Sequence, residues 1–134
     1  MHFSAADVRQ YTEYEKMLGI IFEKSVVYRE IGHAILQEFK AKGDNGSAQD
    51  AGLTSREMSL LSKRFSKSTF YKVINEIMLP LGIIERNPRT HRYYLSPEFP
   101  NALRRLSEYW KKWLKESVST PLSSGASSVP ETYA

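Results

Sequence analysis

The chain of 134 residues contains no cysteine, which excludes disulfide bonds, a cysteine nucleophile and cysteine zinc sites. This absence is compatible with a reducing compartment. Long apolar runs are also missing, because the stretch Leu18 to Phe22 is only a few residues long and includes a glycine. A membrane-spanning helix needs about 20 apolar residues, and a secretory signal needs a basic start before an apolar run. We therefore expect a soluble, cytoplasmic protein with no membrane partner.

Motifs for catalysis and for cofactors are missing as well. The histidines His2, His33 and His91 do not form a ligand set with one another or with carboxylates, so each is interpreted as a solvent-facing or hydrogen-bonded side chain. There is no nucleophile motif or glycine-rich phosphate loop, and the segment 44–46 lacks the oxygen spacing and closing glutamate of a calcium loop. We expect no enzymatic activity, no cofactor and no metal site.

Positive charge is unevenly distributed along the chain. The net charge is +4, but residues 54–115 hold thirteen Lys and Arg against five Asp and Glu, whereas residues 1–53 hold six against eight. A cationic half is typical of a protein that binds a polyanion, because each neutralised phosphate releases condensed counterions. A solvated basic surface has the same composition, so charge alone leaves both interpretations open.

The cationic half begins with two short predicted helices. Thr54-Ser-Arg-Glu57 has the pattern of a capping box, which predicts a helix start. The inward residues of this helix would be Met58, Leu61 and Phe65. A second helix is predicted over 66–79, because Ser66 can cap its start and Pro80 cannot continue it. The apolar residues that recur at helical spacing and predict its buried side are Phe70, Val73, Ile74 and Ile77.

The other side of the 66–79 helix is basic and rich in hydroxyl groups. Such side chains hydrogen-bond phosphates and base edges when a helix enters the major groove. The residues that we expect to contact DNA from this helix are Ser66, Lys67, Ser68, Thr69, Tyr71, Lys72 and Asn75.

A β-hairpin is predicted after this helix. The runs 83–86 and 91–95 have strand composition, and the segment 87–90 between them contains the Asn and Pro that are typical of a turn. The hairpin carries Arg86, Arg89 and Arg92. Long guanidinium side chains suit phosphates or a narrow minor groove, so we expect these arginines to anchor the protein on DNA.

The order helix, turn, helix, hairpin resembles that of the winged-helix DNA-binding regulators of bacteria and archaea, such as the MarR-like and PadR-like proteins. The matching stretches are Leu53-Thr54, Glu57-Met58, 66–72, 81–86 and 92–96. The resemblance covers roughly residues 25–117 and implies a winged helix-turn-helix that binds double-stranded DNA. The chain departs from the pattern because no glycine lies in the turn at Arg64-Phe65, and because Pro80 stands where the family usually continues a helix.

Residues 4–40 are predicted to be helical, as one bent helix or as two. The segment Ser4 to Asp7 has capping composition. Apolar residues follow at helical spacing; these are Val8, Tyr11, Leu18, Ile21, Phe22, Val27, Ile31, Ile35 and Phe39. The first part of this region either contributes to a dimer contact or folds back over its own core. Residues 41–52 are polar and rich in glycine, which predicts a connecting loop.

One further helix is predicted after the hairpin, with Pro97 in its first turn. Its apolar residues recur at alternating spacings of four and three, the seam of a short heptad pattern; they are Phe99, Leu103, Leu106, Trp110 and Trp113. Left in water, this seam would be an apolar patch of the kind that marks interfaces. We expect it to bury against a second subunit, or else against the chain's own helices. From Ser117 onward the composition indicates a disordered tail.

These patterns predict a mainly α fold with a small β-hairpin, namely a winged helix-turn-helix with additional N-terminal and C-terminal helices. We assign residues 1–24 to an N-terminal helix, 25–96 to the DNA-binding domain, 97–117 to a dimerisation helix and 118–134 to the tail. The predicted function is sequence-specific binding of double-stranded DNA by a homodimeric transcription regulator, with a small-molecule effector left open. The alternatives are a plasmid or viral partition or replication-site binder, and a winged-helix module that binds protein.

Overall fold

The structure is a computed structural model that describes residues 1–6, 8, 13–45 and 52–119. The chain divides into two compact units, Met1–Glu98 and Phe99–Ala134. The described elements are α1 (Tyr14–Ile21), α2 (Val26–Asn45), α3 (Ser55–Ser62), α4 (Lys67–Val73), the π-helical segment η2 (Ile74–Met78), β1 (Ile84–Arg86), β2 (Tyr93–Leu95) and α5 (Glu98–Ser119). The predicted fold class is thus confirmed at the level of a mainly helical protein with a small antiparallel hairpin.

The N-terminal region forms two helices, α1 and α2, rather than one bent helix. The backbone leaves the helical conformation at Phe22, whose N–H still donates to the Leu18 carbonyl over 2.8 Å. The Ser25 hydroxyl then accepts a hydrogen bond from the Tyr28 N–H at 3.1 Å and starts α2. Leu18, Ile21 and Phe22 are buried, as their spacing predicts.

The predicted helix start at Ser4 is wrong, because the described residues 1–6 and 8 are not helical. The His2 N–H instead donates to the Ile20 carbonyl at 2.8 Å, so the first residues contact the end of α1. Val8, which was expected to be buried, is exposed. Asp7 and Tyr11 lie outside the described residues.

The buried side of α2 differs by one residue from the prediction. Ile31, Ile35 and Phe39 are buried as expected, but Val27 is exposed and Tyr28 is buried in its place. The side of α2 that packs against the rest of the first unit therefore includes Tyr28 and not Val27. The helix also continues to Asn45. Part of the predicted 41–52 loop is therefore helical, and residues 46–51 lie outside the described residues.

The capping box at the start of α3 is confirmed. The Glu57 N–H donates to Thr54 Oγ1 and the Thr54 N–H donates to Glu57 Oε1, each at 3.0 Å. Lys42 Nζ at the end of α2 lies 2.8 Å from Glu57 Oε2. Partial burial raises the pKa of Glu57, but the hydrogen bonds from Lys42 and Thr54 outweigh it and hold this pKa below its usual value. The same carboxylate thus caps α3 and joins it to α2.

The helix predicted over 66–79 is α-helical only as far as Val73. Ser66 occupies the N-cap position of α4, but its side chain makes no capping hydrogen bond. Residues 74–78 continue as the π-helical segment η2, in which the Leu79 N–H donates to the Ile74 carbonyl at 2.9 Å. Gly82 then adopts a φ of 77°, a left-handed conformation that glycine accepts without a steric cost, and the chain turns into β1.

Strands β1 and β2 form an antiparallel pair in which Glu85 lies opposite Tyr94. Both strands are shorter than the predicted runs 83–86 and 91–95. Leu53 adds a bridge to the other edge of β2, since its N–H and carbonyl both bond Tyr93 at 2.8 Å. This bridge fixes the residue before the α3 cap to the hairpin.

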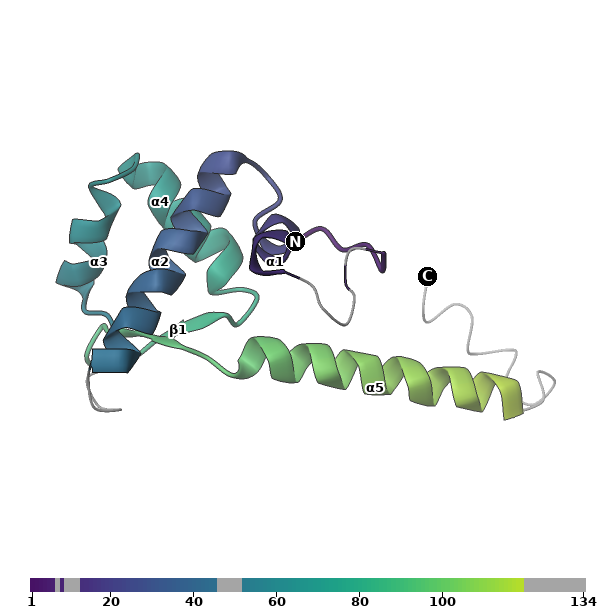
Figure 1. The fold of residues 1–134 in the computed structure, drawn as a ribbon. Helices are drawn as coiled ribbons and strands as arrows, with labels where there is room; N and C mark the ends of the chain where they lie inside the picture. Colours follow the sequence, from purple (N-terminus) through teal and green to yellow (C-terminus); the bar gives the residue numbers. More distant parts are fainter. Residues whose placement is uncertain (7, 9–12, 46–51, 120–134) are drawn as a thin grey trace. The chain divides into compact units, whose positions relative to one another are not determined.

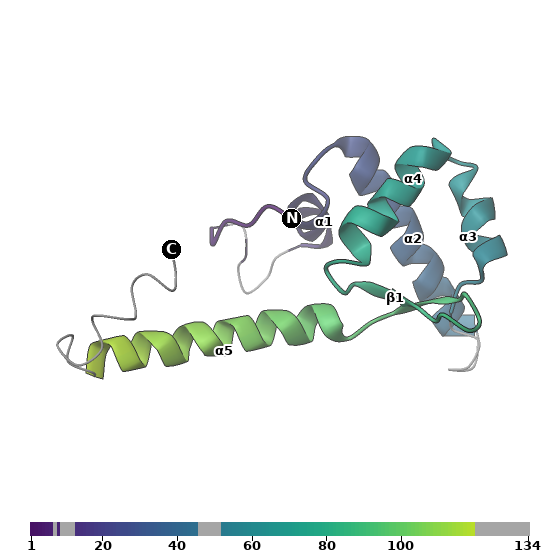
Figure 2. The same cartoon turned by 180° about the vertical axis from the view of Figure 1, so that it is seen from behind.

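Helices α2 and α4 cross in the middle of the first unit, with α2 nearer the viewer in Figure 1 and α4 nearer in Figure 2. The hairpin lies at the end of this unit where α2 finishes and α3 begins, and the turn from α3 to α4 lies at the other end (Figure 1). The largest fully buried side chains come from all of these elements; they are Phe22, Phe70, Ile31, Ile35, Leu53, Met58, Ile74, Met78, Ile84 and Val73. The predicted inward residue Leu61 is buried, while Phe65 and Ile77 are half-buried.

Helix α5 belongs almost entirely to the second unit. It begins at Glu98, whose N–H donates to the Ser96 hydroxyl at 3.1 Å, so Pro97 precedes the helix instead of lying in it. It continues to Ser119, two residues beyond the predicted boundary at 117, and the tail residues 120–134 lie outside the described residues. Among the predicted seam residues, Leu103, Leu106, Trp110 and Trp113 are exposed and Phe99 is half-buried. Tyr109 and Leu114 widen this apolar surface.

Candidate nucleic-acid interface

One side of α4 packs into the core, and the other side carries most of the residues predicted to contact DNA. Phe70 and Val73 are fully buried, whereas Ser66, Lys67, Ser68, Lys72 and Asn75 are exposed. Thr69 and Tyr71 are half-buried, and the Tyr71 ring packs edge-on against Phe70 with their centroids 5.2 Å apart. Asn75 belongs to η2 and not to α4. The exposed side of α4 and η2 therefore carries cations, hydroxyls and an amide, as the sequence pattern predicts.

Two cations that the sequence analysis did not include lie next to the start of α4. Lys63 and Arg64, in the turn between α3 and α4, are both exposed. The Arg64 guanidinium carbon lies 5.7 Å from the centre of the Phe65 ring, which in turn stacks on Phe70. Together with Lys67 these residues concentrate positive charge at this turn. Their charge and their place in the sequence just before the predicted 66–79 helix were the available signals.

The hairpin turn is built around Asn87. Its Oδ1 accepts hydrogen bonds from the N–H groups of Arg89 and Thr90 at 2.8 and 3.2 Å, an Asx arrangement that organises a turn locally. Arg89 is exposed at this turn, and Arg92 beyond it is half-buried. The hydrogen bonds to Asn87 thus fix the backbone of Arg89, whose side chain is exposed.

Arg86 at the end of β1 has neighbours that fix its direction. Its Nη2 lies 2.8 Å from Nδ1 of His91, and its guanidinium carbon lies 5.8 Å from the centre of the Tyr93 ring. The His91 carbonyl accepts a hydrogen bond from the Ser55 hydroxyl at 3.1 Å. The end of the hairpin is therefore joined to the first turn of α3 through His91.

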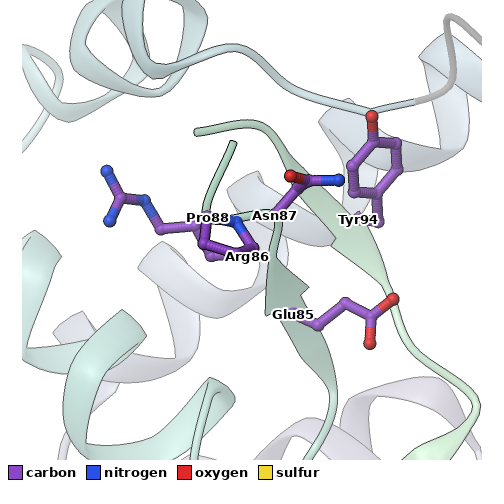
Figure 3. Close-up of a pocket in the computed structure, with 5 residues that line it drawn as sticks. All are labelled: Glu85, Arg86, Asn87, Pro88 and Tyr94. Carbon is purple, nitrogen blue, oxygen red and sulfur yellow. The ribbon is translucent and has the colours of Figure 1, made fainter. Parts of the chain in front are cut away.

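Glu85 and Arg86 extend from opposite sides of β1 (Figure 3). In Figure 3 the Arg86 guanidinium lies on the opposite side of β1 from Glu85 and Tyr94. An open hollow of about 470 Å³ is lined by Glu85, Arg86, Asn87, Pro88 and Tyr94. The carboxylate of Glu85 disfavours a phosphate on its own face. A polyanion is therefore best received on the face that carries the guanidinium of Arg86.

Lys67 and the hairpin arginines lie toward different ends of the first unit (Figures 1 and 2). Lys67 follows the α3–α4 turn, which Figures 1 and 2 place away from the hairpin. The helical stretch from Lys67 to Met78 lies between Lys67 and the hairpin in the sequence. A single duplex that contacts both groups must extend along α4.

His33 does not join this region. His33 is exposed on α2, and its Nδ1 lies 2.9 Å from the Tyr14 hydroxyl. These two side chains help to line a second open hollow, of about 340 Å³, between α1 and α2. Within residues 1–6, 8, 13–45 and 52–119, no three His, Asp or Glu side chains are grouped closely enough to hold a metal ion. In the same part of the chain, no helix combines the length and the apolar character needed to cross a bilayer.

Comparisons of this chain with protein-family models, with curated proteins and with solved structures found no match.

Proposed function

We propose that this protein is a winged helix-turn-helix protein that binds double-stranded DNA and acts as a dimeric transcription regulator. In this proposal α3, the turn and α4 form the helix-turn-helix, and the β1–β2 hairpin is the wing. Helix α4 inserts into the major groove with its exposed side facing the bases. On the wing, Arg86, Arg89 and Arg92 contact the DNA backbone or the minor groove.

The observation that carries this proposal is the division of α4 into two chemically different sides. Phe70, Val73 and Ile74 are fully buried, so the helix cannot rotate without losing its core contacts. The same packing leaves Lys67, Lys72 and Asn75 in solvent. A rigidly held helix that presents cations and hydrogen-bonding groups meets the requirements for direct readout of base edges.

The dimer is supported by the exposed apolar side of α5. The rings of Trp110 and Trp113 lie next to each other, with centroids 5.2 Å apart, and both are exposed. Together with the other exposed apolar residues of α5 they form the kind of surface that marks an interaction site. A second copy of α5 would cover them and would also pair two DNA-binding units, which raises the affinity for a palindromic site.

The direct test begins with a genome-wide pull-down of bound DNA to identify the preferred sequence, followed by affinity measurements on that sequence and on random duplexes. Asn75→Ala should weaken binding to the preferred sequence by about 1–3 kcal/mol and affect random DNA much less. Tyr71→Phe removes only the hydroxyl and keeps the ring contact with Phe70, so it tests base reading without disturbing the core.

The matched control is Gln37→Ala, which changes an exposed polar residue on α2 and should leave both affinities unchanged. Equal losses on both duplexes for Asn75→Ala would assign this residue to positioning and not to reading. Bound sites near promoters would support a regulator, and sites confined to a replication or partition locus would favour the other DNA-binding role. A protein that binds no duplex at all would refute the proposal and favour a protein-binding module.

A further inference from the structure

His91 is held by three separate hydrogen bonds although it is an exposed turn residue. Its backbone has a φ of 60°, a left-handed conformation that is uncommon for residues with a β-carbon. Its N–H donates to the Asn87 carbonyl at 2.8 Å, and its carbonyl accepts from the Ser55 hydroxyl at 3.1 Å. These two bonds fix the backbone of His91. Nδ1 of its ring lies 2.8 Å from Nη2 of Arg86.

The chemistry of this last contact defines the state of the imidazole. A guanidinium remains protonated and has only N–H donors, so Arg86 must donate and Nδ1 of His91 must accept. Nδ1 can accept only in the neutral tautomer that carries its proton on Nε2. The Tyr93 ring provides the second contact of the same guanidinium. Two neighbours therefore hold Arg86 on one face of the hairpin, and its remaining N–H groups stay available as donors.

From this geometry we infer that His91 is a positioning residue, which holds Arg86 in the orientation that contacts a phosphate group of DNA. The inference rests on the proposed function, and it assigns a role to a residue that was not among the expected DNA contacts. A free arginine side chain loses rotamer freedom when it binds a phosphate. Because His91 and Tyr93 restrict Arg86 beforehand, less of that freedom remains to be lost. The hydrogen bond from Ser55 fixes the same residue to α3, so the wing and the helix-turn-helix keep a constant relation.

Two substitutions at His91 separate the role of the ring from that of the backbone. Glycine and asparagine both tolerate the left-handed conformation better than most residues. His91→Gly removes the acceptor, whereas His91→Asn restores an oxygen acceptor at the same number of bonds from the backbone as Nδ1. The probe is a short random-sequence DNA duplex, at one fixed pH and salt concentration. His91→Gly should weaken binding about threefold to tenfold, the effect of one lost hydrogen bond, and His91→Asn should recover most of the loss.

A double-mutant cycle shows whether His91 acts through Arg86. The loss caused by His91→Gly should disappear in an Arg86→Ala background. It should persist in an Arg89→Ala background, which is the matched control because Arg89 lies on the same wing. A urea denaturation curve for each variant confirms that the affinities refer to folded protein. A loss of equal size in both backgrounds, no loss at all, or no recovery by asparagine would overturn the inference.

A measurement without DNA distinguishes this inference from the proposed function. The ¹⁵N chemical shifts of the His91 ring should show the proton on Nε2 in the wild-type protein and a mixture of tautomers in Arg86→Ala. Wild-type protein that shows the fixed tautomer but binds no duplex would refute the proposed function and leave only the pairing. Wild-type protein that binds the duplex but shows no preferred tautomer would refute the role of His91 alone.

Discussion

Gly32→Ala is expected to destabilise the first unit although it replaces a glycine within a helix. A β-carbon at position 32 would lie 2.5 Å from two carbons of the Phe22 ring. Carbon atoms pack comfortably at about 3.5–4.0 Å, so the ring would have to move by roughly an ångström. Phe22 is fully buried and cannot move without displacing its neighbours. Overpacking of this kind costs about 1–3 kcal/mol.

Gly19→Ala provides the matched comparison. Gly19 lies within α1, and a β-carbon there would meet nothing within 4 Å. Replacing glycine by alanine in a helix gains about 1 kcal/mol in helix propensity, and this gain applies to both variants. The difference in unfolding free energy between Gly19→Ala and Gly32→Ala therefore isolates the packing cost, which we expect to be about 1–3 kcal/mol in favour of Gly19→Ala.

Urea denaturation followed by far-ultraviolet circular dichroism measures this difference, provided that the slope of unfolding free energy against urea concentration is the same in all variants. Phe22→Leu offers an independent check, because a smaller side chain makes room for the new methyl group. In combination with Gly32→Ala it should cost less than the sum of the two single changes. Equal stabilities for Gly19→Ala and Gly32→Ala would refute the reasoning from the close contact.

Arg89→Ala should weaken binding to duplexes of any sequence and lower the slope of log affinity against log salt by about one; an unchanged slope would place Arg89 away from the phosphates. Trp110→Ala should reduce dimer formation in sedimentation or light-scattering experiments, and a wild-type monomer at micromolar concentration would contradict the dimer. Thr54→Ala should cost about 1 kcal/mol of stability through the lost cap. Because the pKa of Glu57 is lowered in the folded state, the stability that its carboxylate contributes is present above the pKa of the unfolded state. This stability is lost as the pH falls through the pKa of the folded state. Denaturation curves across the acidic range should show that Thr54→Ala loses less stability than the wild type as the pH falls. Identical pH profiles for the two proteins would argue against a link between the Thr54 cap and the lowered pKa of Glu57.

Local signals in the sequence were sufficient where one short segment determines its own conformation. The capping box of Thr54 and Glu57 requires only residues three apart, and the structure contains both of its hydrogen bonds. The buried side of α4 at Phe70 and Val73 follows from helical periodicity. The hairpin follows from a turn sequence between two runs of strand composition. Most of the predicted DNA contacts on α4, η2 and the hairpin are exposed, and their function remains a prediction.

Contacts between distant residues decided the features that local patterns missed. The pairing of Lys42 with Glu57 joins the end of α2 to the start of α3, in a region whose composition suggested only a loop. The exposure of Val27 and the burial of Tyr28 depend on which side of α2 meets the other helices. His91 illustrates the same limit. Its sequence environment is that of an ordinary turn. Its partner Ser55 belongs to α3 and its partner Arg86 to β1, so only the folded chain brings His91, Ser55 and Arg86 together.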